Sequence, residues 1–134
     1  AATLGRELDL SKGLGVRLRE LSDALDCFIL HKGRITTVTA PGQKIYGMNA
    51  GHSYAATAGS GDVLSGILGA TLAQVDAAEA DAETIFMEIL HAAAIHQHAA
   101  AIAAHTPDGF GLCSASQIAA AVPQAIARLL VMQR

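Results

Sequence analysis

The chain has 134 residues, of which 51% are hydrophobic and 16% are charged, and its formal net charge at pH 7 is −3. This length is enough for one domain with a core of its own. Because tryptophan is absent and no basic cluster is visible, the composition disfavours a nucleic-acid partner. Two isolated cysteines form neither a metal cluster nor a disulfide framework, which favours a reducing cytoplasm.

No stretch predicts targeting or membrane insertion. The first residues lack the basic segment and apolar run of a signal peptide. The alanine-rich tract over 89–104 would be costly to place in a bilayer, because histidines and a glutamine interrupt it. The sequence therefore predicts a soluble protein.

The first part of the chain predicts a helix, a strand and a β-hairpin. A leucine stripe predicts a helix over about 12–25 (Leu14, Leu18, Leu21 and Leu25). The apolar run over 27–30 predicts a strand buried on both faces. The runs over 35–39 and 44–48 predict two strands joined by a type II turn, with Pro41-Gly42 at its centre.

The next part predicts two helices. Apolar residues at helical spacing predict that one begins near Ser60 (Val63, Leu64, Ile67, Leu68 and Leu72). Gly66 and Gly69 each cost this helix about 1 kcal/mol relative to alanine, which indicates that another element packs closely against them. A long helix follows over about 82–105, with an inward-facing set of apolar residues (Ile85, Ile89, Ala92, Ile95 and Ala99).

Three histidines of the long helix lie seven residues apart. Neighbours among His91, His98 and His105 are separated by about 10 Å along the axis, too far to share one metal ion. We therefore interpret them as structural or solvent-facing, and we assign no metal ligands.

The last part predicts a loop and two further helices. The glycine-rich stretch over 106–112 predicts the loop. Ser114 and Gln117 have the spacing of a capping box, which predicts a helix start. Pro123 suits the first position of a last helix, with an apolar side formed by Ile126, Leu129 and Leu130.

A run of small residues leads into Gly59-Ser60-Gly61-Asp62, the most informative stretch of the chain. The first amides of a helix have no partner inside it and, with the positive end of the dipole, they form an anion site. Glycine lets a phosphate approach the backbone. Asp62 would then stand where it can take a proton from a hydroxyl that attacks the phosphate. The alternative is an ordinary loop-to-helix turn, where aspartate is favourable in any protein.

Longer strings around this stretch resemble a known family, the ADP-dependent NAD(P)H-hydrate dehydratases of the ribokinase-like superfamily. The strings are Asn49-Ala50-Gly51 and the run from Ala56 to Gly66. Lys32, Gly33 and Thr36 match the family's Lys-Gly-x-x-Thr motif. Without the resemblance, Lys32 and Gly33 would be an ordinary basic turn after a strand.

The resemblance implies roles for these residues. It implies that one group contacts the adenine nucleotide (Lys32, Gly33, Arg34, Ile35 and Thr36). Gly59, Ser60 and Gly61 are expected to hold its phosphates. Asn49 and Asp62 are expected to face the hydrate. The nucleotide would be ADP or ATP, and Mg²⁺ is expected to bridge phosphate oxygens by analogy with other phosphoryl transfers.

The resemblance also implies a reaction. Asp62 would remove a proton from the ring hydroxyl of the hydrate, and that oxygen would attack the terminal phosphate. Loss of phosphate would then restore NADH or NADPH. Two other functions stay open: a small-molecule kinase of the same superfamily, acting on a sugar, nucleoside or vitamin precursor, and an inactive truncated nucleotide-binding module.

The implied fold is the α/β, three-layer ribokinase-like fold, with residues 1–134 forming a single incomplete domain. Family members are longer, and the chain resembles their C-terminal half, with a short sheet, a β-hairpin and flanking helices. Apolar surface meant for the missing half would be exposed. We therefore expect a homo-oligomer, or pairing with a separate N-terminal half.

Overall fold

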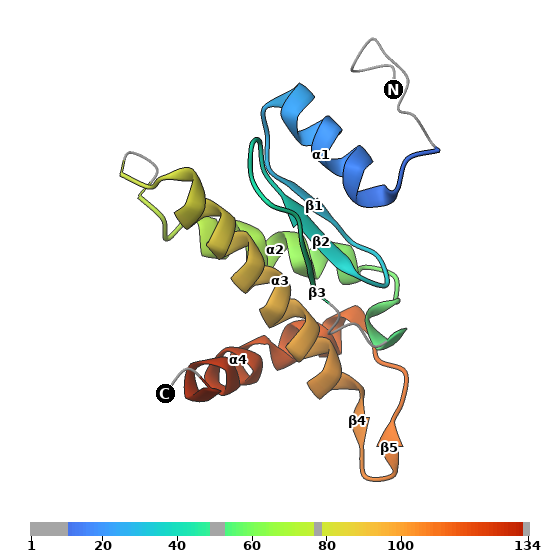
Figure 1. Cartoon of the computed structure of the whole chain (residues 1–134). Helices are drawn as coiled ribbons and strands as arrows, with labels where there is room; N and C mark the ends of the chain where they lie inside the picture. The colour runs from blue at the N-terminus through green and yellow to red at the C-terminus, as the bar shows by residue number, and fades with distance from the viewer. Residues whose placement is uncertain (1–10, 49–52, 77–78, 133–134) are drawn as a thin grey trace. The chain divides into compact units, whose positions relative to one another are not determined.

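The computed structural model describes residues 11–48, 53–76 and 79–132 (Figure 1). The chain separates into two compact units, an N-terminal unit (Ala1–Met48) and a C-terminal unit (Asn49–Arg134).

The N-terminal unit begins with helix α1 (Leu14–Leu25), close to the predicted range. The leucine stripe is only partly buried, because Leu18 is inside whereas Leu14 and Leu25 are exposed. Asp26 ends the helix in a left-handed conformation, with φ of 49°. Ser22, which is fully buried, closes this end by donating its hydroxyl to the carbonyl of Cys27 at 2.6 Å.

Three strands follow α1 and form an antiparallel sheet in the order β1-β2-β3. They are β1 (Ile29–His31), β2 (Thr36–Thr39) and β3 (Tyr46–Met48). The central strand β2 is buried at every position, and its threonines make that interior unusually polar. The prediction of a first strand buried on both faces was wrong, since β1 is an edge strand and is half-buried.

The predicted hairpin between β2 and β3 is confirmed. The N–H of Gln43 donates to the carbonyl of Ala40 at 3.0 Å, which closes a four-residue turn around Pro41 and Gly42. Gly42 has φ of 66°, as the third residue of a type II turn requires. The turn fixes the register that places Val38 opposite Tyr46.

The C-terminal unit is built from three helices after a short 3₁₀ helix, η2 (Ser53–Ala55). They are α2 (Ser60–Leu72), α3 (Ala82–Ala104) and α4 (Ala115–Met132). Helix α3 packs against both α2 and α4 (Figure 1). The main buried cluster consists mostly of alanine, which lets helices approach closely (Ala99, Ala100, Ala104, Cys113, Ile118, Ala121 and Ala125).

Helix α3 matches the predicted long helix. The carboxylate of Asp81 accepts the Thr84 N–H at 2.8 Å and so caps the start of the helix. This bond lowers the pKa of Asp81, because it favours the charged form. Among the described helices, none is long and apolar enough to cross a membrane.

The stretch predicted as a loop contains a small β-hairpin instead. Strands β4 (His105–Thr106) and β5 (Gly109–Phe110) pair antiparallel, and the rings of His105 and Phe110 meet edge to face with centroids 5.7 Å apart. Two residue pairs separated by a turn are too short to give an alternating pattern, which is why the sequence does not reveal the hairpin.

Helix α4 confirms one prediction and corrects another. The capping box is present, because the Ser114 N–H donates to Gln117 Oε1 at 2.8 Å and the Gln117 N–H donates to Ser114 Oγ at 3.3 Å. Pro123 does not start a new helix but lies inside α4. Proline removes one helical hydrogen bond. The helix continues because Ile118 and Ala125, on either side of Pro123, are buried in the same cluster.

The expected close approach at Gly66 and Gly69 is not seen. Both glycines are exposed, and a Cβ atom added to either would meet nothing within 4 Å among the described parts of the chain. The small residues of α2 therefore leave its outer surface open.

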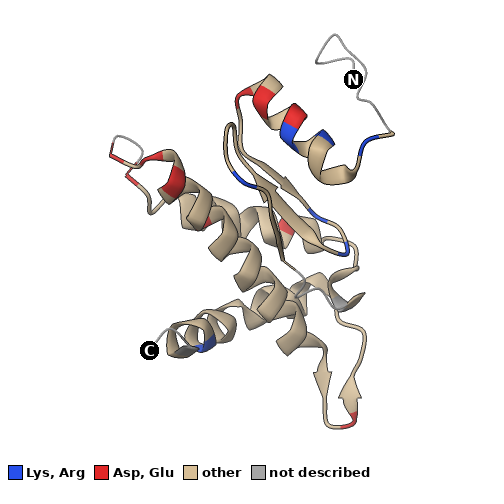
Figure 2. Cartoon of the chain, viewed as in Figure 1, with Lys and Arg blue, Asp and Glu red and all other residues tan. Residues whose placement is uncertain are grey.

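Charge is unevenly distributed. Helix α1 carries both acidic and basic side chains, further basic side chains lie on the loops of the three-stranded sheet, and acidic ones gather around the connection between α2 and α3, whereas most of the surface of α3 and α4 is uncharged (Figure 2). The surface of the C-terminal unit is therefore dominated by neutral groups, apart from the acids before α3.

Candidate nucleotide-binding and acid–base site

The glycine turn, defined here as Gly59–Asp62, forms the start of α2. Gly59 is the N-cap residue and has φ of 80°, in the left-handed region that favours glycine. A Cβ atom at this position would lie 3.2 Å from Cβ of Ala115, so there is little room for a side chain. Both the φ angle and the contact with α4 explain why glycine occupies position 59.

The amides of the glycine turn differ in availability. The N–H of Ser60 donates to the carbonyl of Thr57 at 3.2 Å, and the N–H of Asp62 donates to that of Gly59 at 3.1 Å. Within the described ranges, the Gly61 N–H has no hydrogen-bond partner, and a Cβ atom on Gly61 would meet nothing within 4 Å. Gly61 is therefore the residue at which an anion can reach an unused amide.

Ser60 faces the opposite way. Its side chain is fully buried, and Oγ lies 3.1 Å from Nε2 of His96 on α3. The same nitrogen is 2.9 Å from the carbonyl oxygen of Ser60. The Ser60 side chain is thus turned into the helical unit, and the expected contact of Ser60 with the nucleotide stays a prediction.

Asp62 is exposed in the first turn of α2. Its carboxylate forms no ion pair with any of the residues that the structure describes. It is therefore accessible to a substrate hydroxyl, and its place one residue from the Gly61 amide is the arrangement that the sequence analysis expected.

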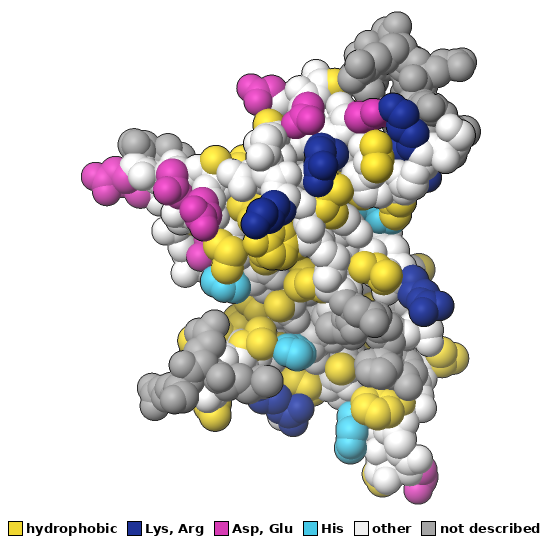
Figure 3. Space-filling model, in the orientation of Figure 1, with side chains coloured by type: hydrophobic (Ala, Val, Ile, Leu, Met, Phe, Trp, Pro, Cys, Tyr) yellow, Lys and Arg dark blue, Asp and Glu magenta, His cyan; other side chains and the backbone are white. Residues whose placement is uncertain are grey.

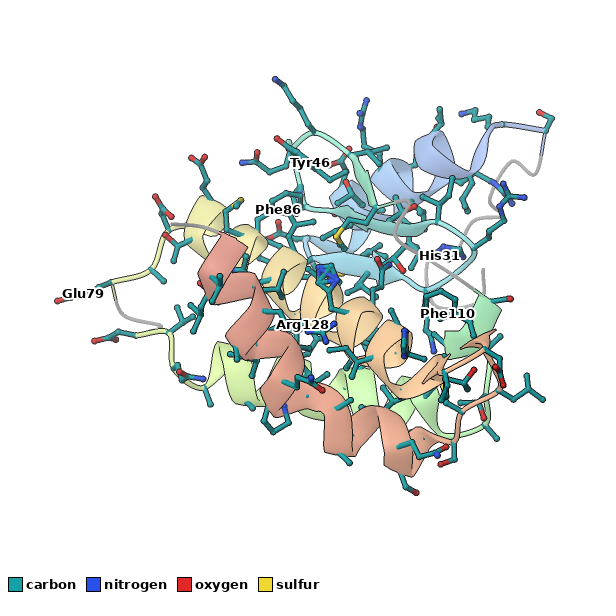
Figure 4. The ribbon with its side chains drawn as sticks, turned by 90° about the horizontal axis from the view of Figure 1, so that it is seen from below. His31, Tyr46, Glu79, Phe86, Phe110 and Arg128 are labelled. Atoms are coloured by element: carbon teal, nitrogen blue, oxygen red, sulfur yellow. The ribbon has the colours of Figure 1, made fainter. Side chains whose placement is uncertain are left out.

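The lysine turn, defined here as Lys32–Thr36, lies in the other unit. It follows His31, the last residue of β1, which is labelled in Figure 4. The turn is exposed from Lys32 to Ile35, whereas Thr36 starts β2 and is buried. Burial lowers the pKa of Lys32, because its charged form is partly desolvated. A Cβ atom on Gly33 would lie 3.0 Å from the ring of His31, so a side chain there would displace that ring.

The structure thus brings the predicted site residues together in two groups. Gly59, Ser60, Gly61 and Asp62 share the glycine turn, and the five residues from Lys32 to Thr36 share the lysine turn. The two turns belong to different units. Asn49, predicted to contact the hydrate, lies outside the described residues.

His96 is the residue that sequence analysis missed. Its side chain is only 2% exposed, and it contacts the start of α2 from the middle of α3. The signal was present, because position 96 continues the inward-facing series of Ile89 and Ala92 at helical spacing. A histidine on such a series is a buried polar group that needs a partner.

A mixed α/β chain with a short antiparallel sheet and packed helices fits the ribokinase-like fold class. The family model described as NAD(P)H-hydrate dehydratase matches residues 7–122. The chain therefore belongs to the NAD(P)H-hydrate dehydratase family, and its short antiparallel sheet with helices is consistent with part of a ribokinase-like domain.

Three curated relatives bear related names. Two are called bifunctional NAD(P)H-hydrate repair enzyme Nnr. That of Corynebacterium glutamicum is 43% identical over 121 residues, covering 81% of this chain and 21% of the relative. That of Mycobacterium leprae is 43% identical over 113 residues, covering 83% of this chain and 22% of the relative. The ADP-dependent (S)-NAD(P)H-hydrate dehydratase of Neisseria meningitidis is 42% identical over 57 residues, covering 42% of this chain and 19% of the relative.

The chain spans about a fifth of the length of the first two relatives. No solved structure gives a significant match.

Proposed function

We propose that this chain supplies the nucleotide-binding and acid–base part of an ADP-dependent NAD(P)H-hydrate dehydratase. Family membership supports the reaction class. The single observation that carries the proposal is the pairing, at the start of α2, of an unused Gly61 amide with the exposed carboxylate of Asp62. A phosphate held by the amide and a hydroxyl held by the carboxylate would be neighbours.

In the proposed reaction, ADP supplies the phosphoryl group. Asp62 accepts the proton of the ring hydroxyl of the hydrate, and the hydroxyl oxygen forms a bond to the terminal phosphorus of ADP. The bond between that phosphorus and the bridging oxygen breaks, and AMP leaves with this oxygen. The Gly61 amide stabilises charge on the transferred group. Phosphate then leaves the ring together with a proton from the neighbouring carbon, which restores the double bond of NADH or NADPH.

The lysine turn would contact the nucleotide through its exposed residues. Lys32 is a mobile point charge suited to phosphate, and Gly33 leaves the backbone uncovered. ADP is favoured over ATP by the name of the Neisseria meningitidis relative. The same contacts would hold the terminal phosphates of either nucleotide.

Mg²⁺ fits the proposed site as a partner of the phosphates. The described residues contain no group of three side chains able to enclose a metal ion. Magnesium in phosphoryl-transfer sites is held largely by phosphate oxygens and water, with only one or two carboxylates, so it does not need an enclosing cluster of side chains. Bound there, the ion would neutralise phosphate charge.

We further propose that the C-terminal unit associates with another polypeptide. An apolar groove of about 860 Å³ runs between α2, α3 and α4, and Ile126 and Leu130 are exposed along it. Hydrophobic side chains gather where α3 and α4 diverge (Figure 3). Either a second copy or a separate N-terminal half would cover this surface. Size-exclusion chromatography with light scattering should show an oligomer, and a monomer at high concentration would contradict self-association.

The function is tested by incubating the chain with NADH hydrate or NADPH hydrate, ADP and Mg²⁺. The expected result is recovery of dihydropyridine absorbance with release of phosphate and AMP, and the preferred hydrate identifies the substrate. A stable phosphorylated alcohol would instead indicate a small-molecule kinase. Binding of ADP without turnover would indicate a nucleotide-binding module. Separately, we propose a cytoplasmic location, which fractionation of cells would test.

A further inference from the structure

The start of α2 is tied to α3 by one buried imidazole. Nε2 of His96 lies 2.9 Å from the carbonyl oxygen of Ser60 and 3.1 Å from its hydroxyl oxygen. His96 is 2% exposed and Ser60 is fully buried. A contact between side chain and backbone at this depth is shielded from water, so its loss would remove a buried hydrogen bond.

The contact with the Ser60 carbonyl bears on the tautomer of this ring. A carbonyl oxygen can only accept a hydrogen bond, so we assign the ring proton to Nε2, the nitrogen that faces it. Nε2 cannot at the same time accept a proton from the Ser60 hydroxyl. The imidazole therefore acts as a donor to the first turn of α2.

A serine and a histidine at this distance resemble a nucleophile and its base, but the pair cannot act as one. The hydroxyl is inaccessible to a substrate because Ser60 has no exposed surface. The donor state of Nε2 also leaves no lone pair to activate that hydroxyl. The contact is therefore suited to fixing geometry.

What the contact fixes is the direction of the residues that follow Ser60. Ser60 is held inward, and the next two residues, Gly61 and Asp62, are both exposed. Since these three positions share one helical turn, the rotation of α2 that buries Ser60 is the rotation that presents the Gly61 amide and the Asp62 carboxylate to solvent. No side chain of the glycine turn itself provides this anchor, because the helix start has no side-chain cap.

We propose that His96 is a positioning residue, which holds the glycine turn in the orientation that binds phosphate and presents Asp62 to the hydrate. This inference rests on the proposed function for the role of the turn, and on the His96–Ser60 contact for the role of the histidine. The important bond is the one to the Ser60 carbonyl, because it restrains the backbone directly.

The test compares four variants with the wild-type chain. His96→Leu removes the donor, and His96→Gln restores an amide N–H close to the place of Nε2. Ser60→Ala removes the hydroxyl but keeps the carbonyl bond. His98→Leu is the matched control, because His98 is on the same helix and is only half-buried. Circular dichroism and thermal unfolding identify the conditions in which each variant is folded, and all comparisons are made there.

The first readout needs no ligand. In NMR spectra of the backbone amides, His96→Leu should shift the Gly59 and Gly61 resonances and speed amide hydrogen exchange at the glycine turn. His98→Leu should change neither the resonances nor the exchange rate. His96→Gln should restore the wild-type resonances in large part. Unchanged Gly61 resonances in folded His96→Leu would overturn the proposal, even if the chain binds no nucleotide.

The second readout is the affinity for ADP by calorimetry and, where turnover is measurable, kcat. His96→Leu should weaken ADP binding about tenfold and lower kcat by on the order of 100-fold, as expected for a misplaced catalytic group. His98→Leu should stay within about twofold of wild type, whereas Ser60→Ala should weaken ADP binding less than His96→Leu does, because it keeps the bond to the carbonyl. Normal affinity and kcat in folded His96→Leu would overturn the proposal. Failure of the wild-type chain to bind ADP would instead count against the proposed function.

Discussion

The two turns proposed to contact the nucleotide, each in its own unit, offer different groups to an anion. The lysine turn, between two strands, exposes a cationic side chain. The glycine turn exposes a backbone amide and a carboxylate, and a buried contact to α3 holds its start in place. The lysine turn therefore offers the charge of a side chain, whereas the glycine turn offers backbone and carboxylate groups whose positions are fixed by a buried contact.

This difference predicts how each turn responds to change. Substitutions in the lysine turn should weaken nucleotide binding gradually, since one of several attractions is lost. Substitutions in the glycine turn should have larger effects on turnover, phosphate binding or stability, because the same few residues form the helix start and are proposed to contact the phosphate and the hydrate. Four variants and a pH series separate these behaviours.

The largest effect is expected at Asp62. Asp62→Asn keeps the shape of the side chain but removes the base, so turnover should fall by about 100-fold or more, whereas ADP affinity should change little. Steady-state kinetics with the hydrate and calorimetry with ADP measure the two quantities. Near-normal turnover would show that Asp62 is not the base.

The next effect separates the two glycines of the glycine turn. Gly59→Ala should destabilise the fold by about 1–2 kcal/mol, because alanine is strained at positive φ and its Cβ would crowd Ala115. Gly61→Ala should not destabilise the fold, because alanine favours a helix and has room here, but it should weaken phosphate binding, since its methyl group would cover an open amide. Denaturant unfolding and calorimetry distinguish them, and equal loss of stability in both variants would contradict the assignment.

A smaller effect is expected in the lysine turn. Lys32→Ala should weaken ADP binding roughly fivefold, equivalent to about 1 kcal/mol for a partly exposed charge, and the effect should shrink as salt is added. Unfolding should be unaffected. Calorimetry at two salt concentrations tests this, with Lys44→Ala as the control at an exposed lysine outside the turn.

The pH dependence sharpens the same point. Burial lowers the pKa of Lys32 from 10.5, so the ammonium loses its proton at a lower pH than an ordinary lysine. ADP affinity should therefore fall as pH rises through this lowered pKa, because the attractive charge is lost. Lys32→Arg should bind ADP with an affinity that does not fall in this range, since arginine stays charged. A parallel fall in both proteins would assign the titration to another group.

Several elements could be predicted because their signals are local. The leucine stripe of α1, the capping box of α4 and the Pro41-Gly42 turn each depend on residues within one or two turns of chain. The start of α2 at Ser60, and with it the exposed place of Asp62, follows from the same kind of pattern.

The errors have a shared cause, which is tertiary context. Pro123 alone predicts a helix start, but α4 continues through it because Ile118 and Ala125, on either side, are buried in the same cluster. The apolar run before Lys32 predicts a fully buried strand, yet its place at the sheet edge leaves it half-exposed. The His96–Ser60 contact joins residues 36 positions apart, which no local pattern reports.

The two exposed glycines inside α2 have a dynamic consequence. Gly66 and Gly69 weaken the intrinsic helix propensity of the element that carries Asp62, whereas α3 and α4 are longer and rich in alanine. Amide protons of α2 should therefore exchange with deuterium before those of α3. Helix α2 is then ordered mainly by what touches it, so a ligand at its first turn would slow that exchange along the helix.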